Sequence, residues 1–320
     1  MSEHPTHFQQ AVFADRGEPL KLAKTKWIGP KAGEVAIKVA ACGINSTDYV
    51  SQYNLIADSQ QMFPVCPGQV VCGEICEVGK DVDDSFKVGM KIGGILRNGG
   101  LGEYALVESA QLVQIDEAVD PAEACLLVFN CSKLAVSYRN NVPDPKDLVC
   151  VHGEGGYARL AIEIFQKMFK HENICLCTLD SKSAPSDYGL DKDQFLTIGK
   201  HLSKSLRSLG EARTVVCVDA PENHIQDIFA GCKDDARIVL LTPSEKPLHV
   251  PTGELVQRGI SINGSPFASR QVIEDTIKAS FEIKLNFQVE RFAFSEKGVR
   301  AAWNQMEKER RWAAPVVVFE

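Results

Sequence analysis

A glycine-rich turn at residues 153–158 carries the clearest sign of ligand chemistry in this 320-residue chain. Gly153, Gly155 and Ala158 match the spacing G-x-G-x-x-A, and Gly156 adds another glycine within the turn. Glycines permit a tight turn and close approach of the backbone to a ligand, and the N–H groups of a following helix attract a pyrophosphate. The same spacing also occurs in purely structural turns. The turn alone therefore leaves a dinucleotide site and a structural turn as alternatives.

The segments on either side of the turn favour the dinucleotide site. Leu148–Val151 is a short apolar run, typical of a strand buried on both faces, and apolar residues at helical spacing follow from Leu160 to Phe165. Further strand-like runs are expected at residues 173–179, 214–218, 237–241 and 259–262, with helical stretches such as 224–230 between them. This alternation predicts a parallel sheet.

An acidic residue, Asp180, ends the second predicted strand of this sheet. A carboxylate there accepts hydrogen bonds from the adenosine ribose hydroxyls and repels a 2′-phosphate, which favours NAD over NADP. Lys182 lies close by in sequence and would instead suit a 2′-phosphate. An ordinary strand-end turn residue is the other interpretation of Asp180.

The first 135 residues have a different character, with alternating or β-branched runs at 10–13, 34–40 and 70–77 and many intervening glycines. This pattern predicts an all-β region with a strongly curved sheet. A largely apolar helix is expected at 123–137. Helices are also expected at 271–280 and 296–309, followed by a strand at 316–319.

Bulk properties exclude several classes of function. A formal net charge of -7 argues against nucleic-acid binding, and no apolar run is long enough to span a membrane. The first residues resemble no signal peptide, and most of the 11 cysteines fall in apolar runs, so we expect a cytoplasmic protein without disulfides. Cys66, Cys72 and Cys76 are too widely spaced for a zinc knuckle.

Four segments resemble the medium-chain dehydrogenase/reductase superfamily: Pro30–Asp48, Pro67–Gly79, Phe86–Ile92 and Gly100–Tyr104. Within it the chain is most similar to zinc alcohol dehydrogenases and to zinc-free quinone and enoyl reductases. The resemblance implies an α/β protein in which a Rossmann-type doubly wound parallel sheet, residues 136–268, is inserted into a GroES-like, mainly β catalytic domain formed by 1–135 and 269–320. It also implies a homodimer.

The resemblance places the catalytic zinc ligands at Asn45, Gln69 and Asn130, where zinc-dependent members have cysteine, histidine and cysteine. Neutral carboxamides are poor zinc ligands, and the neighbouring Cys131 does not make a site alone. The four-cysteine lobe of many relatives is missing as well, because no cysteine lies between Ile92 and Gly100. We therefore expect no zinc.

Zinc-free relatives reduce activated carbonyl compounds, in which hydride adds to an electron-poor carbon and no Lewis acid is needed. The resemblance thus implies an NAD(P)H-dependent reductase of an α,β-unsaturated, quinone or aldehyde-type small molecule. Thr47 aligns with the hydroxyl that relays a proton in the zinc enzymes, and Asn45 and Gln69 are expected beside it as hydrogen-bond donors to the substrate. Asn45 and Thr47 are also residue types that merely stabilise turns.

The cofactor is expected to contact Gly153, Gly155, Gly156, Ala158 and Asp180, and the resemblance adds Ser269. Some positions depart from the family pattern, notably Glu154 and Tyr157 in the turn and Ala314-Pro315 in place of a glycine-arginine pair. A carboxylate inside the turn would repel phosphates unless it points away. These departures motivate the alternative of a catalytically eroded member that acts as a binding or regulatory subunit.

Overall fold

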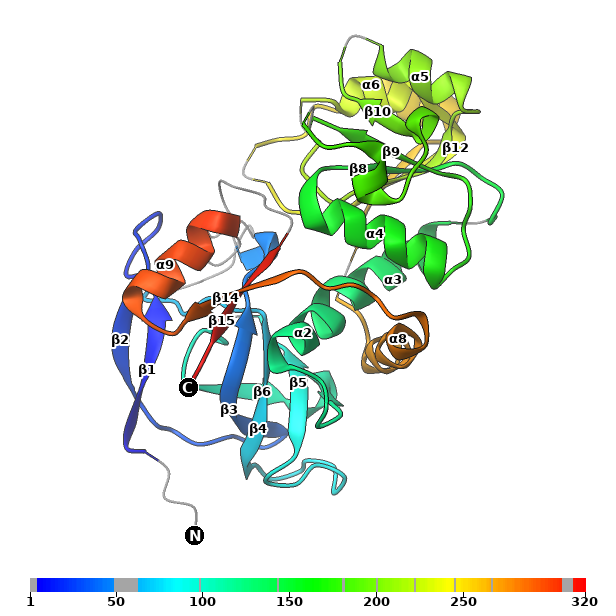
Figure 1. The fold of residues 1–320 in the computed structure, drawn as a ribbon. Helices are drawn as coiled ribbons and strands as arrows, with labels where there is room; N and C mark the ends of the chain where they lie inside the picture. The colour runs from blue at the N-terminus through cyan, green and yellow to red at the C-terminus, as the bar shows by residue number, and fades with distance from the viewer. Residues whose placement is uncertain are drawn as a thin grey trace. The chain divides into compact units, whose positions relative to one another are not determined.

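The computed structural model describes residues 5–48, 63–97, 99–142, 144–179, 182–199, 201–221, 223–244, 246–265, 267–306 and 313–320. The chain divides into two compact units, shown in Figure 1. Unit 1 comprises Met1–Asn130, Ser269–Ile277 and Phe287–Glu320, and unit 2 comprises Cys131–Ala268 and Lys278–Asn286. No helix among the described residues is long and apolar enough to cross a membrane.

Unit 1 is built on a seven-stranded, mostly antiparallel sheet. Its path runs β14 (Val289–Ala293), β15 (Ala314–Val318), β3 (Glu34–Gly43), β4 (Val70–Val78), β5 (Lys91–Ile95) and β7 (Leu112–Gln114), with β6 (Tyr104–Glu108) also paired to β3. Strands β1 (His7–Val12) and β2 (Lys21–Lys26) form a separate antiparallel pair. Two register shifts between β3 and β4 curve the sheet around an apolar core that includes Phe13, Ile37 and Ile75. The predicted all-β region is therefore present.

The helix expected at 123–137 is not continuous. It comprises α2 (Pro121–Cys125), a π-helical segment (Leu126–Cys131) and α3 (Ser132–Asn141). Asp120 caps α2 by accepting hydrogen bonds from the N–H groups of Ala122 and Glu123. Apolar periodicity does not distinguish a π-helical turn from an α-helical one, because both bury the same apolar side chains.

Unit 2 contains a six-stranded sheet whose strand pairings, among the described residues, are all parallel. The strand order is β10 (Phe195–Thr197), β9 (Ile174–Thr178), β8 (Val149–His152), β11 (Ala212–Cys217), β12 (Cys232–Leu240) and β13 (Ser261–Gly264). When the strands are numbered by their sequence order within unit 2, with β8 as strand 1, their order in the sheet is 3-2-1-4-5-6. This is the order of a doubly wound nucleotide-binding fold. Helices α3 and α4 (Gly155–Lys167) contact each other, as do α5 (Leu202–Ser208) and α6 (Ile225–Ala230), and Figure 1 shows the two pairs on opposite faces of the sheet. The predicted parallel sheet is confirmed.

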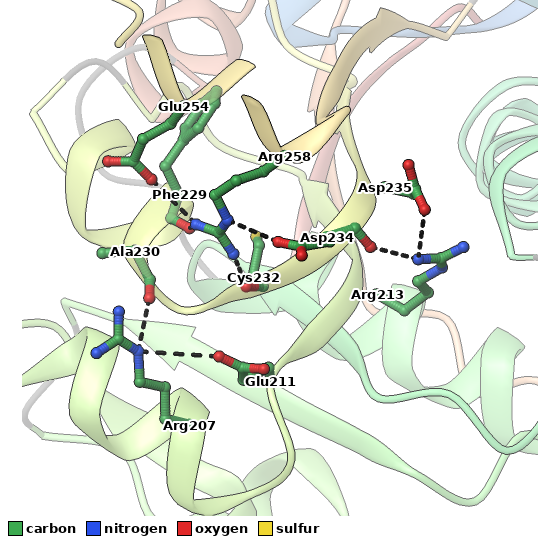
Figure 2. A network of polar contacts seen from close by, with 10 residues as sticks. All are labelled: Arg207, Glu211, Arg213, Phe229, Ala230, Cys232, Asp234, Asp235, Glu254 and Arg258. Carbon is green, nitrogen blue, oxygen red and sulfur yellow. Dashed lines mark hydrogen bonds and ion pairs between the residues drawn. The ribbon is translucent and has the colours of Figure 1, made fainter. Parts of the chain in front are cut away.

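An arginine at the end of α7 (Thr252–Arg258) ties this helix to the start of β12, as Figure 2 shows. The Arg258 guanidinium donates to the carbonyl oxygens of Phe229 (2.9 Å) and Cys232 and forms ion pairs with Asp234 and Glu254, both at 3.0 Å. The side chain is only 22% exposed. The planar guanidinium group donates hydrogen bonds to all of these oxygen atoms at once, which the ammonium group of a lysine could not do.

Replacement of Arg258 by alanine is expected to lower the free energy of unfolding by about 1–3 kcal/mol, since two backbone carbonyls lose their donor. Urea denaturation measures the loss. Arg207→Ala is the matched control, because Arg207 donates to one carbonyl, that of Ala230, from a 59%-exposed side chain. Equal losses in the two variants would contradict the role given to Arg258.

Candidate functional site

The first candidate site is a turn that follows β3 in unit 1, where residues 46–48 form a short 3-10 helix. One carboxylate oxygen of Asp48 accepts a hydrogen bond from the Asn45 N–H (2.9 Å), which closes the turn. The other oxygen accepts from the N–H of Gly68 (2.9 Å), just before β4. Gly68 has φ +101°, and a Cβ there would lie 2.6 Å from the backbone nitrogen of Leu101. Asp48 thus joins the two segments that carry the predicted substrate-facing residues.

Asp48 is completely buried, and this burial raises the pKa of its carboxyl group to about 7. Hydrogen bonds from the backbone N–H groups of Asn45, Gly68 and Gln69 oppose the shift, because they stabilise the ionised form. Asp48 belongs to the segment Pro30–Asp48 of the resemblance, but the sequence indicates no role for it. Its two hydrogen bonds hold the site in unit 1 together.

Thr47 and Gln69 are both buried and contact each other. The part of unit 1 formed by Asn45, Thr47 and Gln69 is called the Thr47 corner. The Gln69 amide donates through Nε2 to the backbone oxygen of Thr47 (3.3 Å), so this expected donor is already engaged. Among the described residues, Thr47 Oγ1 and Gln69 Oε1 have no hydrogen-bond partner. Buried polar atoms normally find a partner. The corner therefore offers a hydroxyl and an amide oxygen to a small polar ligand.

Asn45 is half-buried, and its Nδ2 lies 3.5 Å from the backbone oxygen of Gly43. The structure thus brings Asn45, Thr47 and Gln69 into one corner of unit 1. This donor set does not fit zinc, because both amides direct N–H groups at backbone carbonyls and both oxygens of Asp48 already accept hydrogen bonds. Asn130 is half-buried and Cys131 fully buried in the π-helical segment.

The second candidate site is the glycine turn of unit 2, at the carboxyl end of β8. Gly153 donates to the backbone oxygen of Cys177 (3.0 Å) and has φ +146°, and Gly155 has φ +69°. Two side chains from distant segments fix the turn. Asp219 accepts from the Glu154 N–H (2.9 Å), and the Tyr188 hydroxyl accepts from the Gly155 N–H (3.2 Å). Neither side chain was predicted as part of the site.

Helix α4 begins at Gly155, within the predicted glycine turn, and Ala158 is fully buried where the helix packs close to the sheet. In the described part of the chain, the next two N–H groups, those of Gly156 and Tyr157, have no hydrogen-bond acceptor. Free N–H groups at the positive end of a helix fit a diphosphate. The carboxylate of Asp219 beside the turn acts against an anion, so the turn fits the ligand geometrically but is electrostatically unfavourable for it.

Tyr157 is the least usual residue of the turn. Its hydroxyl is buried without a hydrogen-bond partner among the described residues. Burial raises the pKa of this phenol far above its usual value, and the neighbouring Cys131 and Asp219 raise it further. The phenol therefore stays protonated.

The described structure does not test two of the predicted cofactor residues, Ser269 and Asp180. Ser269 is exposed in unit 1, where its backbone oxygen accepts from Ile273 at the start of α8 (Arg270–Ile283). Asp180, the second residue after the end of β9, lies outside the described residues. Both stay predictions as cofactor ligands.

Replacement of Tyr188 by phenylalanine is expected to lower the stability of the ligand-free protein by about 1 kcal/mol, because the buried Gly155 N–H loses its acceptor. Chemical denaturation followed by circular dichroism provides the measurement. The control is Tyr104→Phe, since the Tyr104 hydroxyl has no hydrogen bond in the described structure. No difference between the two variants would show that Tyr188 does not support the turn.

Comparison with known proteins agrees with this architecture. Residues 31–117 match the alcohol dehydrogenase GroES-like domain. The alcohol dehydrogenase notN of Aspergillus sp. (strain MF297-2) is 27% identical, with 91% of this chain and 93% of that protein covered.

Two solved structures cover nearly the whole chain at 18% identity. An alcohol dehydrogenase (rspB) from E. coli CFT073 complexed with NADH has a TM-score of 0.81 and coverage of 98% and 100%. The cobalt- and zinc-bound thermostable alcohol dehydrogenase of Pyrobaculum aerophilum has a TM-score of 0.77 and coverage of 98% and 99%. The GroES-like domain at residues 31–117 and the fold that the chain shares with these dehydrogenases support the medium-chain dehydrogenase/reductase superfamily.

Proposed function

We propose that this protein is a zinc-independent, NAD(P)H-dependent oxidoreductase that reduces an activated carbonyl compound by hydride transfer. The observation that carries the proposal is the pair of buried, unpartnered oxygen atoms of Thr47 and Gln69 in the described structure. A substrate oxygen bound there would accept the Thr47 hydroxyl proton. Relatives named alcohol dehydrogenases and a structural neighbour complexed with NADH support an oxidoreductase with a nicotinamide cofactor.

The cofactor would be held by the free N–H groups at the start of α4, with Gly153, Gly155 and Gly156 giving the diphosphate room. Ala158, Asp180 and Ser269 are the other proposed contacts, and Asp180 favours NAD over NADP. A bound nicotinamide supplies the hydride. The contribution of the protein is then to position the carbonyl, exclude water and provide a proton.

The chemistry of the Thr47 corner supports independence from zinc. Its side chains offer amides and a hydroxyl where a zinc site needs thiolates or imidazoles. Without a Lewis acid, hydrogen bonds must polarise the carbonyl. Thr47 Oγ1 is placed to donate such a bond, and Gln69 Oε1 can accept from a second polar hydrogen of the substrate. Enones, quinones and aldehydes are therefore better substrates than simple alcohols.

Fluorescence titration tests the cofactor first, with NADH and NADPH quenching Trp27, Trp303 and Trp312. We expect saturable binding of one or both, followed by oxidation of the cofactor in a panel of enones, quinones and aldehydes. Absence of binding at millimolar concentration would disprove the reductase proposal. Stoichiometric zinc in the purified, active protein would disprove the zinc-independent mechanism.

Replacement of Thr47 by valine, which keeps the shape and removes the hydroxyl, is expected to lower kcat/KM by about 10²–10³-fold, as loss of a hydrogen bond to a developing oxyanion does. Stability should change little, since Thr47 Oγ1 has no partner in the described ligand-free structure. Steady-state kinetics and urea denaturation measure the two effects. Unchanged kcat/KM would leave Thr47 with only its role in the turn.

The alternative is a catalytically eroded member that binds a dinucleotide or a partner without turnover. The Asp219 carboxylate at the turn and the half-buried Glu154 favour this possibility. It predicts cofactor binding without turnover of any carbonyl in the panel. A homodimer and a cytoplasmic location are further proposals, testable by analytical ultracentrifugation and by imaging of the tagged protein.

A further inference from the structure

Unit 2 gathers five cysteines in one apolar cluster: Cys150, Cys175, Cys177, Cys217 and Cys232. Three of them lie on neighbouring strands. Cys150 of β8 is opposite Cys175 of β9 in the parallel register, and Cys177 is two residues further along β9. Residues two apart in a strand project from the same face. The register therefore directs the three side chains to one place.

The three sulfur atoms lie at the spacing of a shared metal ion. All are within 4.8 Å of one another, and Cys150 Sγ is 3.1 Å from Cys177 Sγ. Metal–sulfur bonds of about 2.3 Å in a trigonal arrangement separate the sulfurs by about 4 Å, so small side-chain movements would close the site. Among the described residues, this is the only group of three or more such ligands.

The residues around the three sulfur atoms indicate which metal ion would bind. The cluster is packed by apolar side chains such as Leu202, Leu206 and Phe229, and the described structure offers no fourth histidine, cysteine or carboxylate ligand. Zinc sites of this type need four ligands. Thiolates favour soft ions such as Cu(I).

We propose that Cys150, Cys175 and Cys177 form a three-sulfur binding site for Cu(I). Binding releases the protons of the ligating thiols, with no change of oxidation state. The ion connects β8 to β9 directly below the glycine turn. Because the site is buried, the ion enters through local opening of unit 2, and binding raises the apparent stability by mass action.

Anaerobic competition with a chromophoric Cu(I) chelator tests the site on the full-length, reduced protein. We expect one Cu(I) per chain to be withdrawn from the chelator after prolonged incubation, with a higher unfolding temperature. Cys175→Ala should weaken binding at least tenfold. Cys217→Ala is the matched control, because it removes a buried thiol of the same cluster outside the trio and should leave the affinity unchanged.

Failure of the wild-type protein to compete for Cu(I) would overturn the proposal, as would equal affinities of the Cys175 and Cys217 variants. X-ray absorption at the copper edge provides a measurement that does not depend on a folded variant. Three sulfur neighbours support the site. A shell containing nitrogen or oxygen places the ion elsewhere and overturns it.

Discussion

The Gly153→Ala variant is expected to lose about 3–5 kcal/mol of stability in unit 2 and to bind no dinucleotide. Gly153 has φ +146°, which L-residues rarely adopt, and a Cβ would lie 2.4 Å from Val218 Cγ2 and 3.2 Å from the backbone nitrogen of Asp219. Backbone strain of this kind costs about 1–3 kcal/mol, and overpacking costs a similar amount. Urea denaturation gives the stability, and cofactor fluorescence gives the binding.

Gly253→Ala is the matched control. Gly253 lies in the first turn of α7, with no positive φ and no heavy atom within 4 Å of an added Cβ. This variant should be neutral or stabilised by up to about 1 kcal/mol. The double variant Gly153→Ala/Val218→Ala removes the contact but not the backbone strain, so it should recover part of the loss. A Gly153→Ala protein as stable as the Gly253 control would contradict the geometry of the turn.

The glycine turn shows what local sequence can predict. Its position, the strand before it and the helix after it follow from glycine spacing and apolar periodicity, which act over a few residues. Tyr188 and Asp219 close the same turn from 33 and 65 residues away. Neither carries a local signal, since each contact depends on how the strands of the sheet are ordered.

Two short strands, β10 and β14, could not be predicted from the sequence for a similar reason. β10 has three residues and β14 has the sequence Val-Glu-Arg-Phe-Ala, so neither shows enough apolar alternation to be recognised alone. Pairing with β9 and β15 makes them strands. The corner of Asn45, Thr47 and Gln69 was predicted through the resemblance, whereas the role of Asp48 required the three-dimensional structure, because its two acceptor bonds span 3 and 20 residues.

Asp48 is also expected to make the protein less stable as pH rises from 5 to 7. Its carboxyl pKa is about 7 in the folded protein against 3.8 as the ordinary value. Between these values the unfolded chain has released the proton that the folded chain retains, so raising the pH favours unfolding. The loss over these two pH units is about 2–3 kcal/mol, and it ends above the folded pKa.

Comparison of the wild type with Asp48→Asn isolates this contribution, because asparagine cannot titrate and other carboxyl groups are common to both proteins. Urea denaturation from pH 5 to 8 should show the decline in the wild type relative to a flatter Asn variant. Asp83→Asn is the control, since the pKa of the exposed Asp83 is lowered by hydrogen bonds from Ser85 and the decline should persist. Parallel pH profiles for the wild type and the Asp48 variant would show that Asp48 is ionised throughout this range.

Asp48→Ala tests the structural role of the same carboxylate. The N–H groups of Asn45 and Gly68 would both lose their acceptor, at a cost of about 2–5 kcal/mol. The Thr47 hydroxyl would no longer be held beside Gln69, so we expect kcat to fall with the stability, whereas Asp48→Asn, which keeps one acceptor, should retain part of both. Full activity of a folded Asp48→Ala protein would mean that the two segments hold the substrate-facing corner without their shared carboxylate.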